Sequence, residues 1–217
     1  MKSLIIILLS ISLTSCACIE KQNLELAQEQ QDSIRAYKLY NLALAYNLQG
    51  NDALALPLYD SAIILIPNDP DFYNNRGLTR QALEDTIGAI NDFYKAIKID
   101  SLDATPYANL GALYSYFGDF ETSMKYAKKA EKLDSAKYII FNLAHCQYML
   151  GYYEDATTTF LKYLKDKNTQ PQDKIAFYFL GNCYFGLNNM YDAQRCWDKA
   201  NELAGYDYKA EMDKTME

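Results

Sequence analysis

Apolar residues recur along most of the chain with the spacing of one helix face. Leu39, Leu42, Ala43 and Tyr46 follow the i, i+3, i+4, i+7 pattern of an amphipathic helix, and the same pattern returns at residues 107–114. Short polar segments separate these stretches. The pattern therefore predicts helices joined by tight turns, with no strand-like alternation to suggest a sheet.

The turns carry residues that can end a helix. A glycine stands between two helical stretches at Gly50, Gly118 and Gly151. Glycine adopts the left-handed conformation that a helix C-terminus commonly needs. Near the C-terminus Asn188 and Asn189 take this place, and asparagine also tolerates a left-handed backbone. Each pair of helical stretches is thus predicted to form a helix–turn–helix hairpin.

These hairpins repeat at an interval of 34 residues. Segments 39–67, 73–101 and 107–135 superpose without a gap. A small residue recurs in the first helix at Ala43, Gly77, Gly111, Ala144 and Gly181. A second small residue recurs at Ala55, Ala89, Ser123, Ala156 and Ala193. Four residues later stand Tyr59, Phe93, Ala127, Phe160 and Trp197, and a third column holds Ala62, Ala96, Ala130, Tyr163 and Ala200.

Small residues that let two helices approach, with aromatic residues beside them at this period, resemble the signature of the tetratricopeptide repeat (TPR) family. The resemblance implies an all-α fold, a solenoid of about five repeats wound into a right-handed superhelix. The expected repeats are residues 36–69, 70–103, 104–136, 137–170 and 174–207. A tail at 208–217 is expected to cap the last repeat, because an open-ended solenoid exposes its final apolar face.

The first residues resemble a bacterial lipoprotein signal. Lys2 is followed by the apolar run 4–13, which is too short for an ordinary membrane-spanning helix, and the run ends in Leu-Thr-Ser-Cys. We expect a signal peptide at 1–15, lipid on Cys16, and a Gln/Glu-rich tether at 16–35 that runs into a short helix. Cleavage after Ala17 is the alternative, and it would release a soluble protein. The lipid-anchored form is expected at a bacterial membrane, the outer one in preference to the inner.

Charge and composition narrow the function classes. The formal net charge of −7 disfavours nucleic acid as a partner. The single histidine, His145, leaves no basis for a Ser-His-Asp triad or a His-rich metal site, so we expect no enzyme activity, metal or cofactor. Cys146 and Cys183 occupy equivalent places in neighbouring repeats. Equivalent helices lie about 8–10 Å apart, too far for a disulfide, so both thiols are expected to be buried and free.

Two basic residues interrupt the apolar stripe of the second repeat. Arg76 and Arg80 stand where the other repeats mostly carry apolar or aromatic residues. Burying an unpaired charge is costly, so a carboxylate partner is required. Asp92, on the second helix of the same hairpin, is the predicted partner of Arg76.

A partner-binding groove is expected along the first helices of the repeats. In the TPR family a column of asparagines faces the concave side, where each amide can pair with the N–H and C=O of an extended guest peptide. Here the column holds Asn41, Asn75, Asn109 and Asn142. Further groove residues are Tyr116, Phe141, His145, Tyr148, Tyr178, Phe179, Asn182 and Phe185. The alternative is that some of these aromatic residues pack beneath the C-terminal tail.

The sequence therefore indicates an interaction scaffold of the bacterial envelope that binds other envelope proteins or extended peptides and reaches the membrane through its lipid. An alternative is a surface or secretion-associated lipoprotein that presents a glycan or peptide, since an aromatic groove suits sugars as well as peptides.

Overall fold

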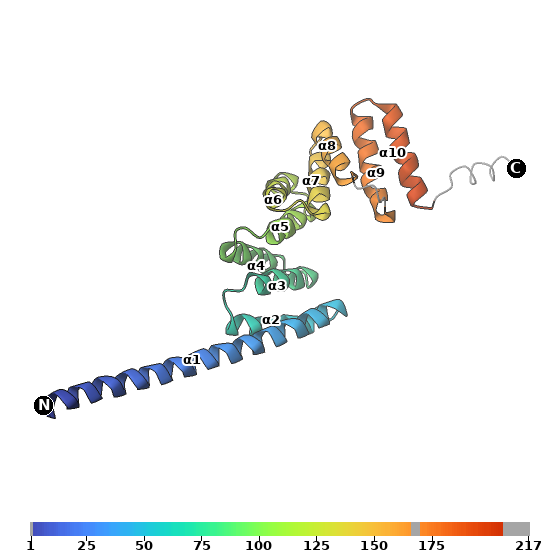
Figure 1. Ribbon diagram of the computed structural model, residues 1–217. Helices are drawn as coiled ribbons and strands as arrows, with labels where there is room; N and C mark the ends of the chain where they lie inside the picture. Colours follow the sequence, from blue (N-terminus) through green and yellow to red (C-terminus); the bar gives the residue numbers. More distant parts are fainter. Residues whose placement is uncertain (1, 166–169, 206–217) are drawn as a thin grey trace. The chain divides into compact units, whose positions relative to one another are not determined.

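The computed structural model describes residues 2–165 and 170–205, with side chains from residue 20 onward except that of Gln172. The described residues are all-α (Figure 1). The helices are α1 (Lys2–Leu48), α2 (Asp52–Leu65), α3 (Pro70–Ala82), α4 (Thr86–Ile99), α5 (Thr105–Tyr116), α6 (Phe120–Leu133), α7 (Lys137–Met149), α8 (Tyr153–Tyr163), α9 (Lys174–Gly186) and α10 (Met190–Leu203), with a short 3₁₀ turn, η1 (Pro171–Asp173), before α9.

Successive helices pair into five antiparallel hairpins: α1 with α2, α3 with α4, α5 with α6, α7 with α8, and α9 with α10. The chain divides into two compact units, residues 1–99 and 100–217. The first unit holds the first two hairpins and the second unit holds the last three. The expected capping tail at 208–217 lies outside the described residues.

A left-handed residue ends the first helix of every hairpin. Gly50, Gly118 and Gly151 have φ values of 74°, 79° and 77°, as the sequence indicated. Asn188, with φ 58°, takes the same place in the fifth hairpin. In the second hairpin the residue is Glu84, with φ 64°. A side chain at this backbone conformation costs about 1–2 kcal/mol relative to glycine, so Glu84 marks a strained turn.

The small columns allow close packing within a hairpin. A Cβ atom on Gly77 would lie 2.8 Å from the ring of Phe93, and one on Gly181 would lie 2.5 Å from the indole of Trp197. Real Cβ atoms do not approach other atoms so closely. In the second and fifth hairpins the glycine of the first helix therefore makes room for the aromatic residue of the second helix.

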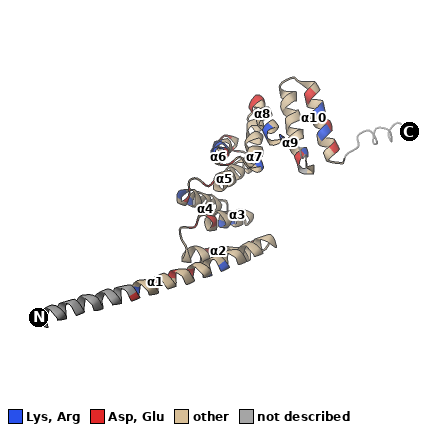
Figure 2. Ribbon diagram, viewed as in Figure 1, with Lys and Arg blue, Asp and Glu red and all other residues tan. Residues whose placement is uncertain are grey.

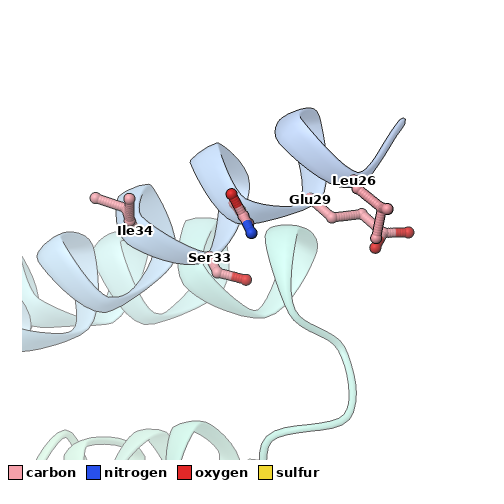
Figure 3. Close-up of a pocket in the computed structure, with 5 residues that line it drawn as sticks. Leu26, Glu29, Ser33 and Ile34 are labelled. Atoms are coloured by element: carbon pink, nitrogen blue, oxygen red, sulfur yellow. The ribbon is translucent and has the colours of Figure 1, made fainter. Parts of the chain in front are cut away.

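Helix α1 begins well before the first hairpin. Residues 20–31 are all exposed, and the helix packs against α2 only from about Ser33 onward. A shallow pocket along this projecting part is lined entirely by α1, at Leu26, Glu29, Gln30, Ser33 and Ile34 (Figure 3). Where the sequence predicted a tether running into a short helix at 16–35, the structure has one continuous helix. No glycine or proline interrupts the Gln-, Glu- and Leu-rich sequence from residue 20 to 48, so its helix propensity is high throughout.

In the described part of the chain, no helix combines the length and the apolar character needed to cross a membrane.

Candidate functional site: an aromatic surface on α7 and α9

The first helices of the second unit line one side of its stack. Helix α5 contacts α7, and α7 contacts α9, so the first helices of successive hairpins lie next to one another. Side chains on their shared face can therefore meet across repeats. The predicted groove residues of this unit stand on these three helices.

Five rings from this unit form a cluster around Phe179. The Phe179 cluster consists of Phe141, His145 and Tyr148 on α7, Phe160 on α8 and Phe179 on α9. The ring centroid of Phe179 lies 5.0 Å from that of His145, 5.2 Å from Tyr148, 6.0 Å from Phe160 and 6.4 Å from Phe141. Phe160 is stacked and the others are tilted or edge-on, which are favourable aromatic geometries.

The spacing of these residues explains why they meet. On α7, Phe141, His145 and Tyr148 are four and three residues apart and share one helix face. On α9, Phe179 stands two residues before Gly181, the place that Asn142 holds before Ala144 in the preceding hairpin. The fifth hairpin thus carries a phenylalanine in the asparagine column, and this ring fills the space between α7, α8 and α9.

The cluster is partly core and partly surface. Phe141, Tyr148 and Phe179 are half-buried and pack against the apolar core that includes Phe160 and Leu180. Beside them Tyr178 is 54% exposed and contacts Phe179 at a ring distance of 5.8 Å. The predicted groove aromatics are therefore not uniformly exposed. Phe141, Tyr148, Phe160 and Phe179 pack into the core, and Tyr178 is exposed beside Phe179.

Burial changes the acid–base character of His145. Its ring lies among Phe120, Phe141 and Phe179, with centroid distances of 6.2, 6.4 and 5.0 Å. Removal of water by these rings lowers the pKa of the imidazole below its ordinary value of 6.5. His145 is therefore favoured in its neutral form, in which one ring nitrogen accepts and the other donates a hydrogen bond.

Asn182 links α7, α9 and α10. Its amide oxygen accepts a hydrogen bond from the indole N–H of Trp197 at 3.0 Å, and its amide nitrogen donates a long hydrogen bond to the Tyr148 hydroxyl at 3.5 Å. Because the indole fixes the amide orientation, the Tyr148 hydroxyl proton is left to point elsewhere. The sequence indicated Asn182 as a groove residue but missed this link, although a half-buried indole N–H generally requires an acceptor.

Asparagines of this column take part in more interactions within the chain than the sequence suggested. Asn75 donates from its amide nitrogen to the Tyr40 hydroxyl and to the Asp71 carbonyl oxygen, both at 2.9 Å. Both N–H groups are thus occupied, and only the amide oxygen can reach a guest in this conformation. Asn41 is exposed, and Asn142 is half-buried. Asn109 is half-buried and interacts within the chain. The expectation of two guest bonds per amide does not hold for Asn75.

The outer predicted aromatics are the most exposed. Tyr116, at the end of α5, is 80% exposed and contacts the neighbouring Phe117 edge-on at 5.2 Å. Phe185, near the end of α9, is 55% exposed and lies 6.0 Å from the Trp197 ring. Phe117 and Tyr138 are also exposed, and sequence reasoning missed them because they lie outside the repeating columns.

The first unit contains the predicted ion pair. Arg76 donates to both carboxylate oxygens of Asp92, from Nε at 2.9 Å and from Nη2 at 2.6 Å, which confirms the prediction. Arg80 also donates to Asp92, at 2.8 Å, and the Nη1 atom of Arg76 reaches Asp60 on α2 at 2.8 Å. Burial lowers the pKa of Arg76, but the hydrogen bonds and charges of Asp92 and Asp60 outweigh it, so the pKa is raised. This cluster joins three helices and serves packing.

Cys146 and Cys183 are buried and free, as predicted. Burial raises the pKa of Cys146, although its sulfur lies 2.9 Å from the hydroxyl of Ser123, and burial raises the pKa of Cys183 to about 11. Thiolates are therefore disfavoured at both positions.

Two segments match the family model of the tetratricopeptide repeat, residues 70–101 and 104–137. They coincide with the second and third hairpins. Two curated plant proteins from Arabidopsis thaliana are similar over about 100 residues: the TPR repeat-containing thioredoxin TTL4, at 31% identity, and the Protein CTR9 homolog, at 30%. Each match covers 46% of this chain, but only 14% and 10% of the two plant proteins' lengths.

Solved structures share the fold over most of the chain. YrrB, described as a TPR protein with an unusual peptide-binding site, has a TM-score of 0.66 at 20% identity and covers 91% of this chain and 97% of its own. PilF of Pseudomonas aeruginosa has a TM-score of 0.71 at 18% identity, covering 82% and 80%. PilW, a type IV pilus biogenesis factor, has a TM-score of 0.68 at 20% identity, covering 78% of each chain. At these identities the likeness concerns the fold.

Proposed function

We propose that this chain, which belongs to the tetratricopeptide repeat family, is an interaction scaffold of the bacterial envelope that binds an extended segment of a partner protein across α7 and α9. The observation that carries the proposal is the Phe179 cluster together with the exposed Tyr178 ring beside it. The peptide-binding description of YrrB and the pilus-biogenesis description of PilW support an interaction role.

The chemistry of this surface suits a peptide with an apolar side chain. Tyr178 and Phe179 offer a contiguous apolar area, and buried aromatic anchors usually dominate the energy of an interface. The neutral His145 and the hydroxyl of Tyr148 provide polar groups beside that area. An extended peptide needs such donors and acceptors for its backbone, because an unpaired backbone group costs about 1–3 kcal/mol on burial.

The envelope location rests on the N-terminal sequence. The apolar run at 4–13 and the Leu-Thr-Ser-Cys motif ending at Cys16 support export and lipid attachment. Two or three acyl chains hold a protein stably at a membrane, since each buried CH₂ contributes roughly 0.8 kcal/mol. In some bacteria an aspartate directly after the lipidated cysteine retains a lipoprotein in the inner membrane. Position 17 here is alanine, which favours the outer membrane.

The decisive experiment compares two baits in the native envelope. Lipidated wild-type protein and its Tyr178→Ala variant are used to capture partners, which are identified by mass spectrometry. A partner protein should be enriched by the wild type and lost with the variant, and a peptide from it should then bind the purified wild type. Capture that is equal for both baits would place the binding surface elsewhere. Recovery of glycans without protein would favour the glycan-presenting alternative.

A further inference from the structure

Within each unit, the second helices of neighbouring hairpins flank a first helix: α2 and α4 flank α3, α6 and α8 flank α7, and α8 and α10 flank α9, and the space between each pair is called a groove below. In two of these grooves an ion pair crosses the space. Between α2 and α4 the guanidinium of Arg76 joins Asp60 to Asp92, and between α6 and α8 the ammonium of Lys162 contacts Glu131 at 2.5 Å. In each of these two grooves, the helix that comes first in the chain supplies the carboxylate of the ion pair: Asp60 on α2 and Glu131 on α6.

The groove between α8 and α10 has no such carboxylate. Counting from the third column, Leu161 stands at the place of Asp60, and Leu164 stands at the place of Glu131. Lys199 corresponds to Lys162, since each precedes its third-column residue. The position equivalent to Glu131 is thus a leucine in this groove, and Lys199 contacts Glu202 of its own helix at 2.7 Å instead.

A cavity of about 610 Å³ lies in this groove. Its apolar lining comes from Leu161 and Leu164 at the end of α8, Phe177, Leu180 and Tyr184 on α9, and Cys196 on α10. Its polar lining comes from Lys165, Asp192, Arg195 and Lys199. Charged residues of both signs follow one another along α10 (Figure 2), and Arg195 contacts Asp192 at 3.4 Å. Three cations and one carboxylate therefore line an otherwise apolar cavity in a chain whose net charge is negative.

We propose that this cavity is a second binding site, distinct from the Phe179 cluster, for a small molecule that joins an apolar body to one carboxylate. The carboxylate takes the place that Glu131 holds in the preceding groove, between Lys199, Arg195 and Lys165. The apolar body lies against Leu161, Leu164 and Phe177. The volume is within the roughly 300–1,000 Å³ range of small-molecule sites, and charge-assisted hydrogen bonds are the stronger kind.

The test uses 4-phenylbutyrate as the probe, with 4-phenylbutylamine and 4-phenylbutanol as matched controls. Cys196 lines the cavity, so its rate of alkylation by iodoacetamide, followed by peptide mass spectrometry on the full chain, reports occupancy. We expect 4-phenylbutyrate to protect Cys196 with an affinity about tenfold or more above those of the amine and the alcohol. Equal protection by all three probes, or none by the carboxylate, would overturn the proposal.

Two variants at one position separate charge from shape. Leu164→Glu places a carboxylate opposite Lys199, as in the preceding groove, and should weaken binding of 4-phenylbutyrate by about tenfold or more. Leu164→Gln has the same shape without the charge and should retain most of the binding. Circular dichroism establishes that each variant is folded, and Lys199→Gln offers an alternative at a partly exposed position that should also weaken binding about tenfold. Equal affinities of the Glu and Gln variants would contradict the proposed role of the carboxylate.

Discussion

Arg76 and Asp92 meet in a two-point contact between α3 and α4, with side chains only 13% and 4% exposed. Arg80 shares the same carboxylate. Replacing Asp92 by alanine removes the buried carboxylate that both guanidinium groups share, and leaves them only the more exposed carboxylates of Asp60 and Asp85. We expect a loss of about 3 kcal/mol in the free energy of unfolding, measured by urea denaturation, because breaking a buried pair leaves uncompensated charge.

The third hairpin supplies the control for this prediction. At the places of Arg76, Arg80 and Asp92 it carries Leu110, Tyr114 and Tyr126, and the two tyrosine rings are stacked at 5.7 Å. The triple variant Arg76→Leu, Arg80→Tyr, Asp92→Tyr should lie within about 1 kcal/mol of the parent or above it, since well-packed apolar groups can replace a buried ion pair. A triple variant as unstable as Asp92→Ala would contradict the charge argument.

At the strained turn, we expect a substitution of Glu84 to stabilise the protein, in contrast to the loss expected for Asp92→Ala. Glu84→Gly should raise the free energy of unfolding by about 1 kcal/mol, because glycine adopts φ 64° without steric cost. Gly118→Ala should lower it by about 1–2 kcal/mol. No atom lies within 4 Å of a Cβ placed on Gly118, so that loss is purely conformational. Thermal or urea unfolding of both variants checks the pair, and changes of the same sign would contradict it.

The repeat pattern predicted the hairpins because one physical rule, a small residue facing an aromatic, acts in four of the five units, the third having Ala127 in the aromatic column. It predicted the left-handed turns where glycine or asparagine stands, but not at Glu84, where packing of the hairpin overrides the preference of the residue. It predicted the Arg76–Asp92 pair because unpaired buried charge is excluded. Asp60 was missed because it comes from the preceding hairpin, and contacts across repeats depend on how the helices stack.

The groove was predicted less well than the fold. A column identifies the face of a helix on which a residue lies, but not how deeply its side chain is covered. Phe179 and Tyr178 are adjacent in sequence, yet one ring contacts five aromatic neighbours and the other stands exposed. Asn75 illustrates the same limit, since its hydrogen bond to Tyr40 depends on the neighbouring helix α1.

His145 predicts a pH dependence of stability. Its folded-state pKa lies below the unfolded value of about 6.5, so the unfolded chain binds the proton more tightly. The contribution of neutral His145 to the free energy of unfolding should therefore decrease as the pH drops through 6.5. This contribution should be lost completely once the pH is below the folded-state pKa. The urea midpoint of the parent should decline more between pH 7.5 and pH 5 than that of His145→Gln. An identical decline in both proteins would contradict this assignment.

The proposed lipid attachment at Cys16 predicts the behaviour of the Cys16→Ser variant. Cys16→Ser removes the thiol that the lipoprotein motif presents for acylation. The variant should be found in the soluble fraction or remain unprocessed, whereas the parent should partition with membranes. Fractionation and mass spectrometry of the N-terminus check this. A Cys16→Ser protein that is processed normally and stays with membranes would show that the anchor lies elsewhere.

Tyr178 and Phe179 allow binding to be separated from packing by two neighbouring substitutions on α9. Tyr178→Ala removes an exposed ring with a single aromatic contact to Phe179, so stability should change by less than about 0.5 kcal/mol, while partner affinity should fall by about 2 kcal/mol or more if the ring is an anchor. Phe179→Ala removes the centre of the Phe179 cluster and should cost about 3–5 kcal/mol of stability as well as affinity. Unfolding curves and binding isotherms on the same preparations distinguish the two effects. If Tyr178→Ala leaves affinity unchanged while Phe179→Ala lowers only stability, the aromatic surface is a packing feature, and the partner must bind at the asparagine column or on the second helices.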